Sequence, residues 1–260
     1  MMTDQVVVYS VDGAVARITL NRPEKRNALN DAVIEGIKEG LKTAAGDEQV
    51  RAVVISGAGK DFCSGADLSA LQKIAGASVA ENSEDARLLL ELFLLIRQVP
   101  VPVIAAVTGR ALAGGCGLAS ACDLVLAATS ARFGYPEVKI GFVPAMVMAI
   151  LRRNVSEKRA LELITRGEEI SAQQAKEFGL VNQVFNDETF AADVEAYAKR
   201  FEELSRQAIA LTKALLYQID GLAFPEALET GADVNVIARM SEDCQKGIAK
   251  FLTKNRPKSV

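Results

Sequence analysis

Histidine and tryptophan are absent from this chain of 260 residues. Without histidine the chain cannot form a Ser-His-Asp or Cys-His nucleophile system, and it cannot bind zinc or haem through imidazole. Any acid or base that it uses in catalysis must therefore be a carboxylate, lysine, tyrosine or cysteine. The charges are nearly balanced, with 30 Lys and Arg against 33 Asp and Glu, which argues against a basic surface for nucleic acid.

Cysteines and long apolar runs are also scarce. The chain has 4 cysteines and no CxxC pair, so we expect reduced thiols in the interior of a cytoplasmic protein. The longest apolar stretches, 101–107 and 111–122, are separated by Arg110 and end at Asp123, which makes each too short to cross a membrane. Residues 1–10 lack the basic and apolar segments of a signal peptide. We therefore expect no membrane partner.

The residues that are present indicate an α/β protein with a large core, because 50% of them are apolar and 24% are charged. Short β-branched runs alternate with helical stripes up to about residue 145, and the later pattern is almost entirely helical. We expect a core over 1–195 and a helical region over 196–260. The predicted strands are 6–9, 15–20, 52–55, 101–107 and 124–127, the first two forming a hairpin. The predicted helices are 32–44, 83–98, 156–165, 171–178, 189–204, 208–219, 224–239 and 241–253.

Two segments rich in glycine and small residues follow predicted strands, at 56–68 (SGAGKDFCSGADL) and 109–118 (GRALAGGCGL). Neither has the spacing of a P-loop or of GxGxxG. Each segment alone is more typical of a tight turn than of a site. Both, however, place backbone N–H groups near the start of a predicted helix, where they stabilise negative charge. Two such donors from separate loops would form an oxyanion hole, which could stabilise a thioester enolate.

The ordered motifs of the chain resemble the crotonase superfamily, the enoyl-CoA hydratase/isomerase family. The resemblance runs from Val15 to about Pro257. Its motifs are NRPEKRNALN at 21–30, FCSGADL at 62–68, PVIAAVTG at 102–109, AGGC at 113–116, ACDL at 121–124 and ARFGYPEV at 131–138.

The resemblance implies a spiral of ββα units, a helical C-terminal region that builds a trimer or a dimer of trimers, and a coenzyme A thioester substrate. It implies no metal, and no cofactor beyond the coenzyme A that belongs to the substrate. It assigns the oxyanion hole to the backbone N–H groups of Ala66 and Gly114. The residues that it places along the substrate are Lys25, Ala28, Ala66, Asp67, Leu68, Ser69, Gly114, Phe251 and Lys254, the last two reaching the coenzyme A of a neighbouring subunit.

The catalytic carboxylates depart from the family's pattern at one position. Hydratases of the family use two glutamates to hold one water; here the Pro136-Glu137 step is present, but Gly117 stands at the first position. Glu137 alone can move a proton between carbons, as family isomerases do. The run 141–146 instead resembles bacterial hydratases for branched acyl-CoA, which look able to work without the first glutamate. We favour a hydratase, keep an isomerase as the alternative, and keep a non-catalytic acyl-CoA-binding or assembly module as the third.

Four polar residues near these motifs have more ordinary interpretations. Asp67 is expected to cap a turn or helix rather than to act as an acid, and Asp123 is expected to be structural. Cys63 and Cys116 are interpreted as small packing residues, since no basic neighbour is evident to stabilise a thiolate. Arg110 either forms a salt bridge or lines the acyl pocket. Replacing Gly117 by glutamate would test whether the missing carboxylate limits hydration.

Overall fold

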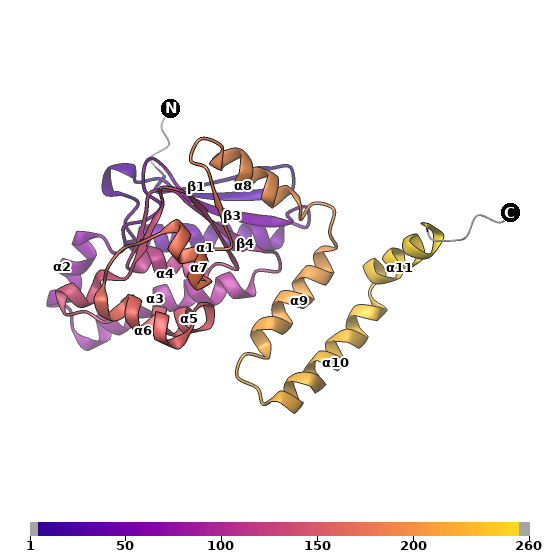
Figure 1. Ribbon diagram of the computed structural model, residues 1–260. Helices are drawn as coiled ribbons and strands as arrows, with labels where there is room; N and C mark the ends of the chain where they lie inside the picture. Colours follow the sequence, from indigo (N-terminus) through magenta and orange to yellow (C-terminus); the bar gives the residue numbers. More distant parts are fainter. Residues whose placement is uncertain (1–4, 255–260) are drawn as a thin grey trace. The chain divides into compact units, whose positions relative to one another are not determined.

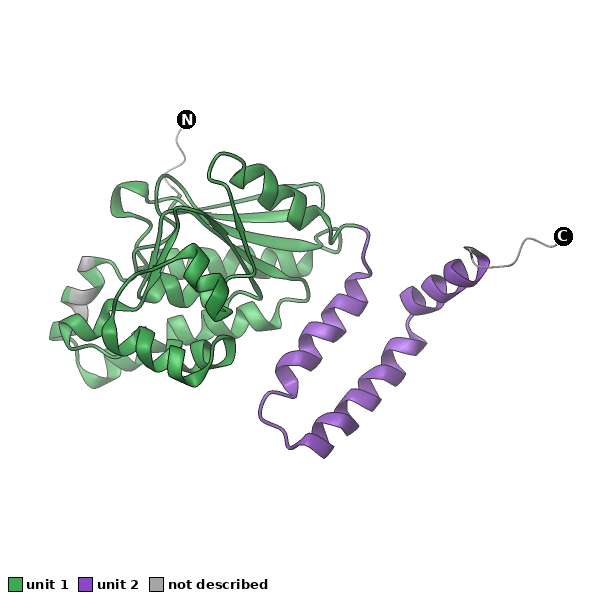
Figure 2. Ribbon diagram, in the orientation of Figure 1, with its two compact units in different colours: residues 1–202 green, residues 203–260 purple. Residues whose placement is uncertain are grey.

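The computed structural model describes residues 5–254, apart from the side chains of Leu68, Leu71, Lys73, Ile74 and Lys254. The chain divides into two compact units, residues 1–202 and 203–260 (Figure 2). The sequence placed the corresponding boundary at 195/196, which lies within helix α8 (Phe190–Lys199).

A six-stranded sheet forms the centre of the first unit, in the order β1-β2-β3-β4-β6-β9 (Figure 1). The hairpin pair β1 and β2 is antiparallel, and every later neighbour is parallel. Every residue of β4 is buried, as expected for a parallel strand covered on both faces. The bounds are β1 (Val7–Asp12), β2 (Val15–Leu20), β3 (Ala52–Gly57), β4 (Val103–Val107), β6 (Leu124–Ala128) and β9 (Gln183–Phe185).

A second, three-stranded sheet consists of β5 (Arg110–Leu112), β7 (Arg132–Gly134) and β8 (Ile170–Ser171). Strand β5 pairs in parallel with β7, which pairs antiparallel with β8. The sequence analysis predicted none of these strands. They are two or three residues long, which is too short for the alternation of side chains to show.

Some helices of the first unit begin at side-chain caps. The Asn30 side chain accepts a hydrogen bond from the Val33 N–H at 3.0 Å, which confirms the predicted start of α1. Ser78 and Glu81 form a capping box for α3, as do Ser171 and Gln174 for α7. The helical segments are η1 (Pro23–Lys25), α1 (Asp31–Gly46), α2 (Leu68–Gly76), α3 (Val79–Gln98), α4 (Gly114–Ala121), η2 (Pro136–Ile140), α5 (Ala145–Asn154), α6 (Glu157–Arg166), α7 (Ala172–Phe178) and α8.

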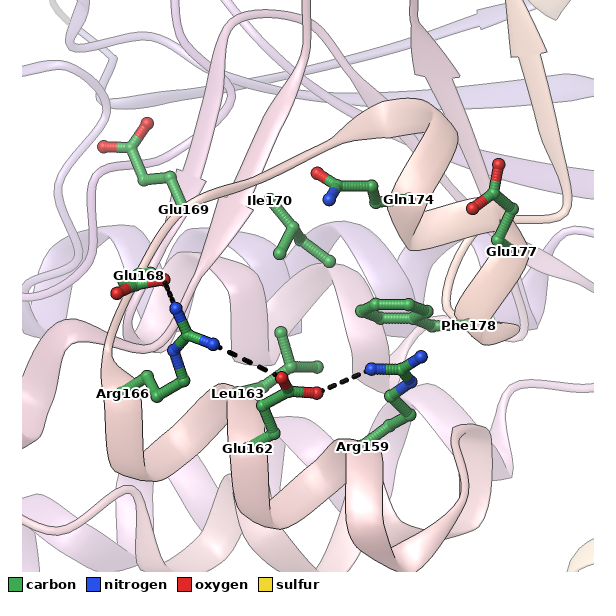
Figure 3. A pocket seen from close by; sticks show the side chains of 10 residues that line it. All are labelled: Arg159, Glu162, Leu163, Arg166, Glu168, Glu169, Ile170, Gln174, Glu177 and Phe178. Carbon is green, nitrogen blue, oxygen red and sulfur yellow. Dashed lines mark hydrogen bonds and ion pairs between the residues drawn. The ribbon is translucent and has the colours of Figure 1, made fainter.

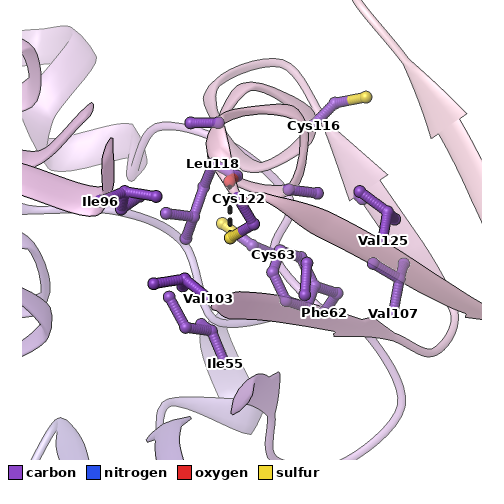
Figure 4. Close-up of a cluster of buried hydrophobic side chains, with 14 of the residues drawn as sticks. Ile55, Phe62, Cys63, Ile96, Val103, Val107, Cys116, Leu118, Cys122 and Val125 are labelled. Carbon is purple, nitrogen blue, oxygen red and sulfur yellow. Dashed lines mark hydrogen bonds between the residues drawn. The ribbon is translucent and has the colours of Figure 1, made fainter. Parts of the chain in front are cut away.

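Three cysteines, one of them on α4 and one directly after it, lie in the hydrophobic core (Figure 4). Cys63, Cys116 and Cys122 are buried free thiols, and Cys122 donates to the Leu118 carbonyl at 3.3 Å. Burial raises the pKa of Cys63 and of Cys116 to about 12. Both thiols are therefore protonated at neutral pH, which confirms them as packing residues.

Over residues 203–254 the second unit has three helices, α9 (Arg206–Gln218), α10 (Phe224–Met240) and α11 (Glu242–Lys254). Each of the three contacts the other two. Large apolar side chains remain exposed on them, among them Phe224, Val236, Ile237, Met240 and Phe251. Across residues 5–254, no helix combines the length and apolarity that a membrane span requires.

Candidate active site

The two glycine-rich segments lie side by side and are joined by backbone hydrogen bonds. Phe62 donates to the Thr108 carbonyl at 2.9 Å and Cys63 to the Arg110 carbonyl at 3.0 Å, while Leu112 donates back to Cys63 at 3.0 Å. These bonds attach the segment that follows β3 to the start of β5. The structure thus brings together two segments that are about fifty residues apart in the sequence.

Two glycines allow the closest approach of these segments. Gly65 has φ +97°, and a Cβ there would lie 2.8 Å from Cβ of Ala113 and 3.6 Å from the backbone nitrogen of Gly114. A Cβ on Gly115 would lie 2.3 Å from the Cys63 carbonyl oxygen. A side chain at either position would push the first turn of α4 away from the Phe62–Gly65 segment.

The Ala66 N–H points away from the strand-like pairing that holds its neighbours. Leu29 donates to the Gly65 carbonyl at 2.7 Å, and Asp67 donates to the Leu29 carbonyl at 2.9 Å. In this parallel bridge between Leu29 and Ala66, the N–H of Ala66 faces the opposite side. Ala66 lies two residues before α2, so this donor comes from an extended segment and not from the helix turn that the sequence suggested.

The Gly114 N–H is the first amide of helix α4. Ala113, just before it, has φ 50° and ψ −127°, a strained conformation for a residue with a side chain. The Ala113 N–H donates to the Gly134 carbonyl at 2.9 Å, and the first helical bond runs from Gly117 to the Ala113 carbonyl. The amides before Gly117 therefore lie outside the helical ladder and at the positive end of the helix dipole. Together with Ala66, Gly114 can act as an oxyanion hole.

Glu137 is a buried carboxylate on η2, with 8% of its surface exposed. Its Oε2 atom is buried and receives no hydrogen bond from any residue that the structure describes. Desolvation raises the pKa of this carboxyl group above its ordinary value. The segment that carries Glu137 is attached to the start of α4, because the Ala113 N–H donates to the Gly134 carbonyl at 2.9 Å. A buried carboxyl group with an unused oxygen is suited to take and return a proton.

A buried hydroxyl pair connects α4 to the segment that carries Glu137. The Ser120 and Tyr135 hydroxyl oxygens are 2.7 Å apart, and Ser120 Oγ also donates to the Cys116 carbonyl at 2.6 Å. Tyr135 is 1% exposed and precedes Glu137 by two residues. Sequence reasoning missed this pair, since a serine and a tyrosine 15 residues apart carry no local signal.

Both carboxylate oxygens of Asp67 accept hydrogen bonds. Arg22 donates to Oδ2 at 2.7 Å, while the Ser69 N–H and Oγ donate to Oδ1 at 3.0 and 2.9 Å. These donors lower the pKa of Asp67 to about 2. The carboxylate caps the start of α2, which confirms the cap that the sequence predicted in place of an acid.

Asp67→Ala is expected to lower the free energy of unfolding by about 1–2 kcal/mol, because it removes a cap and an ion pair. Since the folded state depresses the pKa, this stabilisation is present above the ordinary value of 3.8 and disappears as the pH falls through about 2. Urea denaturation at a series of pH values measures both effects. An unchanged midpoint at neutral pH would contradict the capping role.

Glu137→Gln is expected to raise the melting temperature at neutral pH. Because burial raises the Glu137 pKa above 4.5, the folded state retains a proton that the unfolded state releases, and stability falls as the pH rises through this window. Glutamine removes the buried charge, so the gain should vanish below about pH 4.5, where wild type is also neutral. Thermal unfolding of both proteins across this range tests the prediction. A pH-independent difference would refute it.

The other residues that are expected to contact the substrate differ in their exposure to solvent. Lys25 and Ser69 are exposed, and Ala28 is buried, with its carbonyl accepting from Arg22 at 2.9 Å. Phe251 is exposed on α11 of the second unit. The side chains of Leu68 and Lys254 lie outside the described residues.

Arg110, whose role the sequence left open, has a carboxylate partner in the structure. Its Nε lies 3.6 Å from Glu169 Oε1, which favours the salt-bridge alternative over a place in the acyl pocket. Both side chains are about half exposed, so we expect the pair to contribute little to stability.

A hollow of about 380 Å³ lies between α6, β8 and α7, and Glu169 is among the residues that line it (Figure 3). Two arginines and four glutamates line it, and Glu162 pairs with both Arg159 and Arg166. Because carboxylates outnumber the cations, this hollow is unsuited to the phosphates of coenzyme A.

Among the described residues, no group of three or more Cys, Asp or Glu is placed to hold a metal ion.

The family model for enoyl-CoA hydratase/isomerase matches residues 10–259. The chain belongs to the enoyl-CoA hydratase/isomerase family. The 2,3-dehydroadipyl-CoA hydratase of Escherichia coli is a relative, 34% identical over 252 residues that cover 96% of this chain and 97% of that protein. The mitochondrial enoyl-CoA hydratase domain-containing protein 3 of Danio rerio is 34% identical over 94% of this chain and 84% of its own.

Solved structures of the family share the fold. The enoyl-CoA hydratase of Mycobacterium smegmatis superposes with a TM-score of 0.91 at 34% identity, covering 97% of this chain and 98% of that one. The crotonase superfamily and the mixed α/β crotonase fold that the motifs predicted are thereby confirmed. The chain is thus an enzyme of this family.

Proposed function

We propose that the protein hydrates a 2-enoyl-CoA, with Glu137 as acid and base and the Ala66 and Gly114 N–H groups as oxyanion hole. The observation that carries this proposal is the buried Oε2 of Glu137, which no described residue engages, on a segment that is hydrogen-bonded to α4. Several relatives are named as hydratases, and this supports hydration over other reactions of the family.

The reaction balances with one carboxylate. Glu137 takes a proton from water as the water oxygen bonds to the third carbon of the enoyl group. The electrons of the double bond move toward the thioester, whose oxygen accepts hydrogen bonds from Ala66 and Gly114. The protonated Glu137 then gives its proton to the second carbon, which restores the thioester carbonyl. This cycle needs no resident cofactor, because coenzyme A enters and leaves as part of the substrate.

Double-bond isomerisation is the second candidate reaction for this site. Gly117 supplies no second carboxylate to orient water, and Glu137 alone can move a proton from the second to the fourth carbon. The same oxyanion hole stabilises the dienolate of that reaction. Isomerisation and hydration therefore differ in whether a water molecule is bound beside Glu137.

We propose that coenzyme A lies along 25–28 and 66–69, where exposed Lys25 is available to its phosphates, and that Phe251 and Lys254 contact the coenzyme A of another subunit.

The exposed apolar side chains of α10 and α11 support a homotrimer or a dimer of trimers, since side chains of this kind mark interfaces. The buried free thiols suit a reducing cytoplasm. Sedimentation equilibrium would test the assembly; a monomer would refute it.

A panel of straight and branched 2-enoyl-CoA and 3-enoyl-CoA thioesters tests the proposed reaction. Hydration of a 2-enoyl-CoA is scored by the added mass of one water and by loss of conjugated absorbance. Isomerisation of a 3-enoyl-CoA is scored by gain of that absorbance at unchanged mass. We expect hydrated product from at least one 2-enoyl-CoA. A double-bond shift without hydration would replace the hydratase by the isomerase, and binding without either reaction would favour a non-catalytic module.

A further inference from the structure

The space beside Gly117 is filled by side chains from two other helices. A Cβ built on Gly117 would lie 2.6 Å from Cγ2 of Val147 and 3.5 Å from Cζ of Phe93. Val147, in the first turn of α5, is 4% exposed, and Phe93 of α3 is 6% exposed. Because real Cβ atoms essentially never approach another atom within 3.0 Å, any side chain at position 117 requires Val147 to move.

This packing lies at the proposed site. Gly117 follows Gly114 by three residues on α4, so both positions share one face of the helix. The Ala113 N–H donates to the Gly134 carbonyl at 2.9 Å, and the Ser120 and Tyr135 hydroxyl oxygens are 2.7 Å apart, so the segment that carries Glu137 lies beside α4. The Val147 and Phe93 side chains that fill the space beside position 117 therefore lie on the face of α4 that carries Gly114.

We propose that Val147 is a specificity-determining residue, because its side chain forms the wall beside the second and third carbons of the acyl group. It occupies the space that a side chain at position 117 would need, and it excludes a methyl branch on the third carbon. This inference rests on the proposed function. It also predicts that Gly117→Glu loses stability and activity while Val147 is present.

The contact itself is tested by stability, without any substrate. Gly117→Ala, Val147→Ala and the double variant are compared by thermal unfolding. Glycine-to-alanine changes inside helices ordinarily stabilise, and Gly231→Ala on α10, where a Cβ meets nothing within 4 Å, is the control for that gain. We expect Gly117→Ala to lower the melting temperature in wild type and to lower it much less in the Val147→Ala background. Equal effects in both backgrounds would overturn the inference.

Specificity is tested with 2-butenoyl-CoA and 3-methyl-2-butenoyl-CoA. Val147→Ala is expected to raise the ratio of kcat/KM for the branched over the straight thioester by about 10-fold or more. Val155→Ala, which truncates another buried valine at the end of α5, should leave that ratio unchanged. An unchanged ratio in Val147→Ala refutes this inference alone. If wild type turns over neither these thioesters nor any in the panel, the proposed function fails and the specificity role fails with it, while the stability comparison still decides the contact.

Discussion

Glu137→Gln is expected to lower kcat about 10³-fold, because it removes the proton acceptor and donor of the reaction. The amide has nearly the same size as the carboxyl group, and the donors at Ala66 and Gly114 belong to other segments. Affinity for an acyl-CoA thioester should therefore change little. Stopped-flow or steady-state turnover measures the first effect, and isothermal titration with a saturated acyl-CoA measures the second.

Glu168→Gln is the matched control for this substitution. Glu168 is exposed and pairs with Arg166 at 2.6 Å, outside the proposed site, so turnover should stay within a few-fold of wild type. Activity of wild type should fall as the pH drops through the raised pKa of Glu137, since the proton acceptor is then occupied. Turnover of Glu137→Gln equal to that of the control would exclude Glu137 as the base.

Gly65→Ala is expected to lower kcat by about 10²–10³-fold, the usual cost of losing one oxyanion donor. The positive φ of Gly65 disfavours a side chain, and the added Cβ would meet Cβ of Ala113 at 2.8 Å. Relief of this overlap moves the Ala66 amide away from the Gly114 amide. The effect should fall mainly on kcat, because the two donors bind the charge that develops during the reaction.

Gly46→Ala separates this effect from a general response to replacing glycine. Gly46 ends α1, and a Cβ there would meet no atom within 4 Å. We expect wild-type kinetics from this variant. Circular dichroism and thermal unfolding verify that Gly65→Ala is folded. A folded Gly65→Ala protein with wild-type kcat would contradict the assignment of the oxyanion hole.

The parts of the fold that the sequence predicted correctly are those with strong local signals. The hairpin of β1 and β2 is set by two β-branched runs around Asp12-Gly13, and α1 begins at the predicted Asn30 cap. The strands β5 and β7 were missed because their pairing depends on contacts across the chain, between Ala111 and Phe133 for example. Tertiary hydrogen bonding, and not local propensity, makes these segments extended.

The candidate site was predictable in its residues but not in its packing. Ala66, Gly114 and Glu137 follow from motifs whose order resembles the family. Their proximity depends on non-local facts, such as the bridge that turns the Ala66 N–H outward and the strained φ of Ala113. The overlap between position 117 and Val147 was equally invisible, since 30 residues separate the two in the sequence. Local patterns therefore predict the chemistry, while the proposed wall depends on tertiary packing that the sequence does not show.

Hydration in ¹⁸O-labelled water tests the central claim most directly. The wild-type protein, Glu137→Gln and Glu168→Gln are incubated with 2-butenoyl-CoA in labelled water, and the thioesters are analysed by mass spectrometry. We expect the hydrated product to carry one ¹⁸O atom when it is formed by wild type or by Glu168→Gln. We expect almost no labelled product from Glu137→Gln. Equal label in Glu137→Gln and wild type, or no label in wild type, would contradict the central claim.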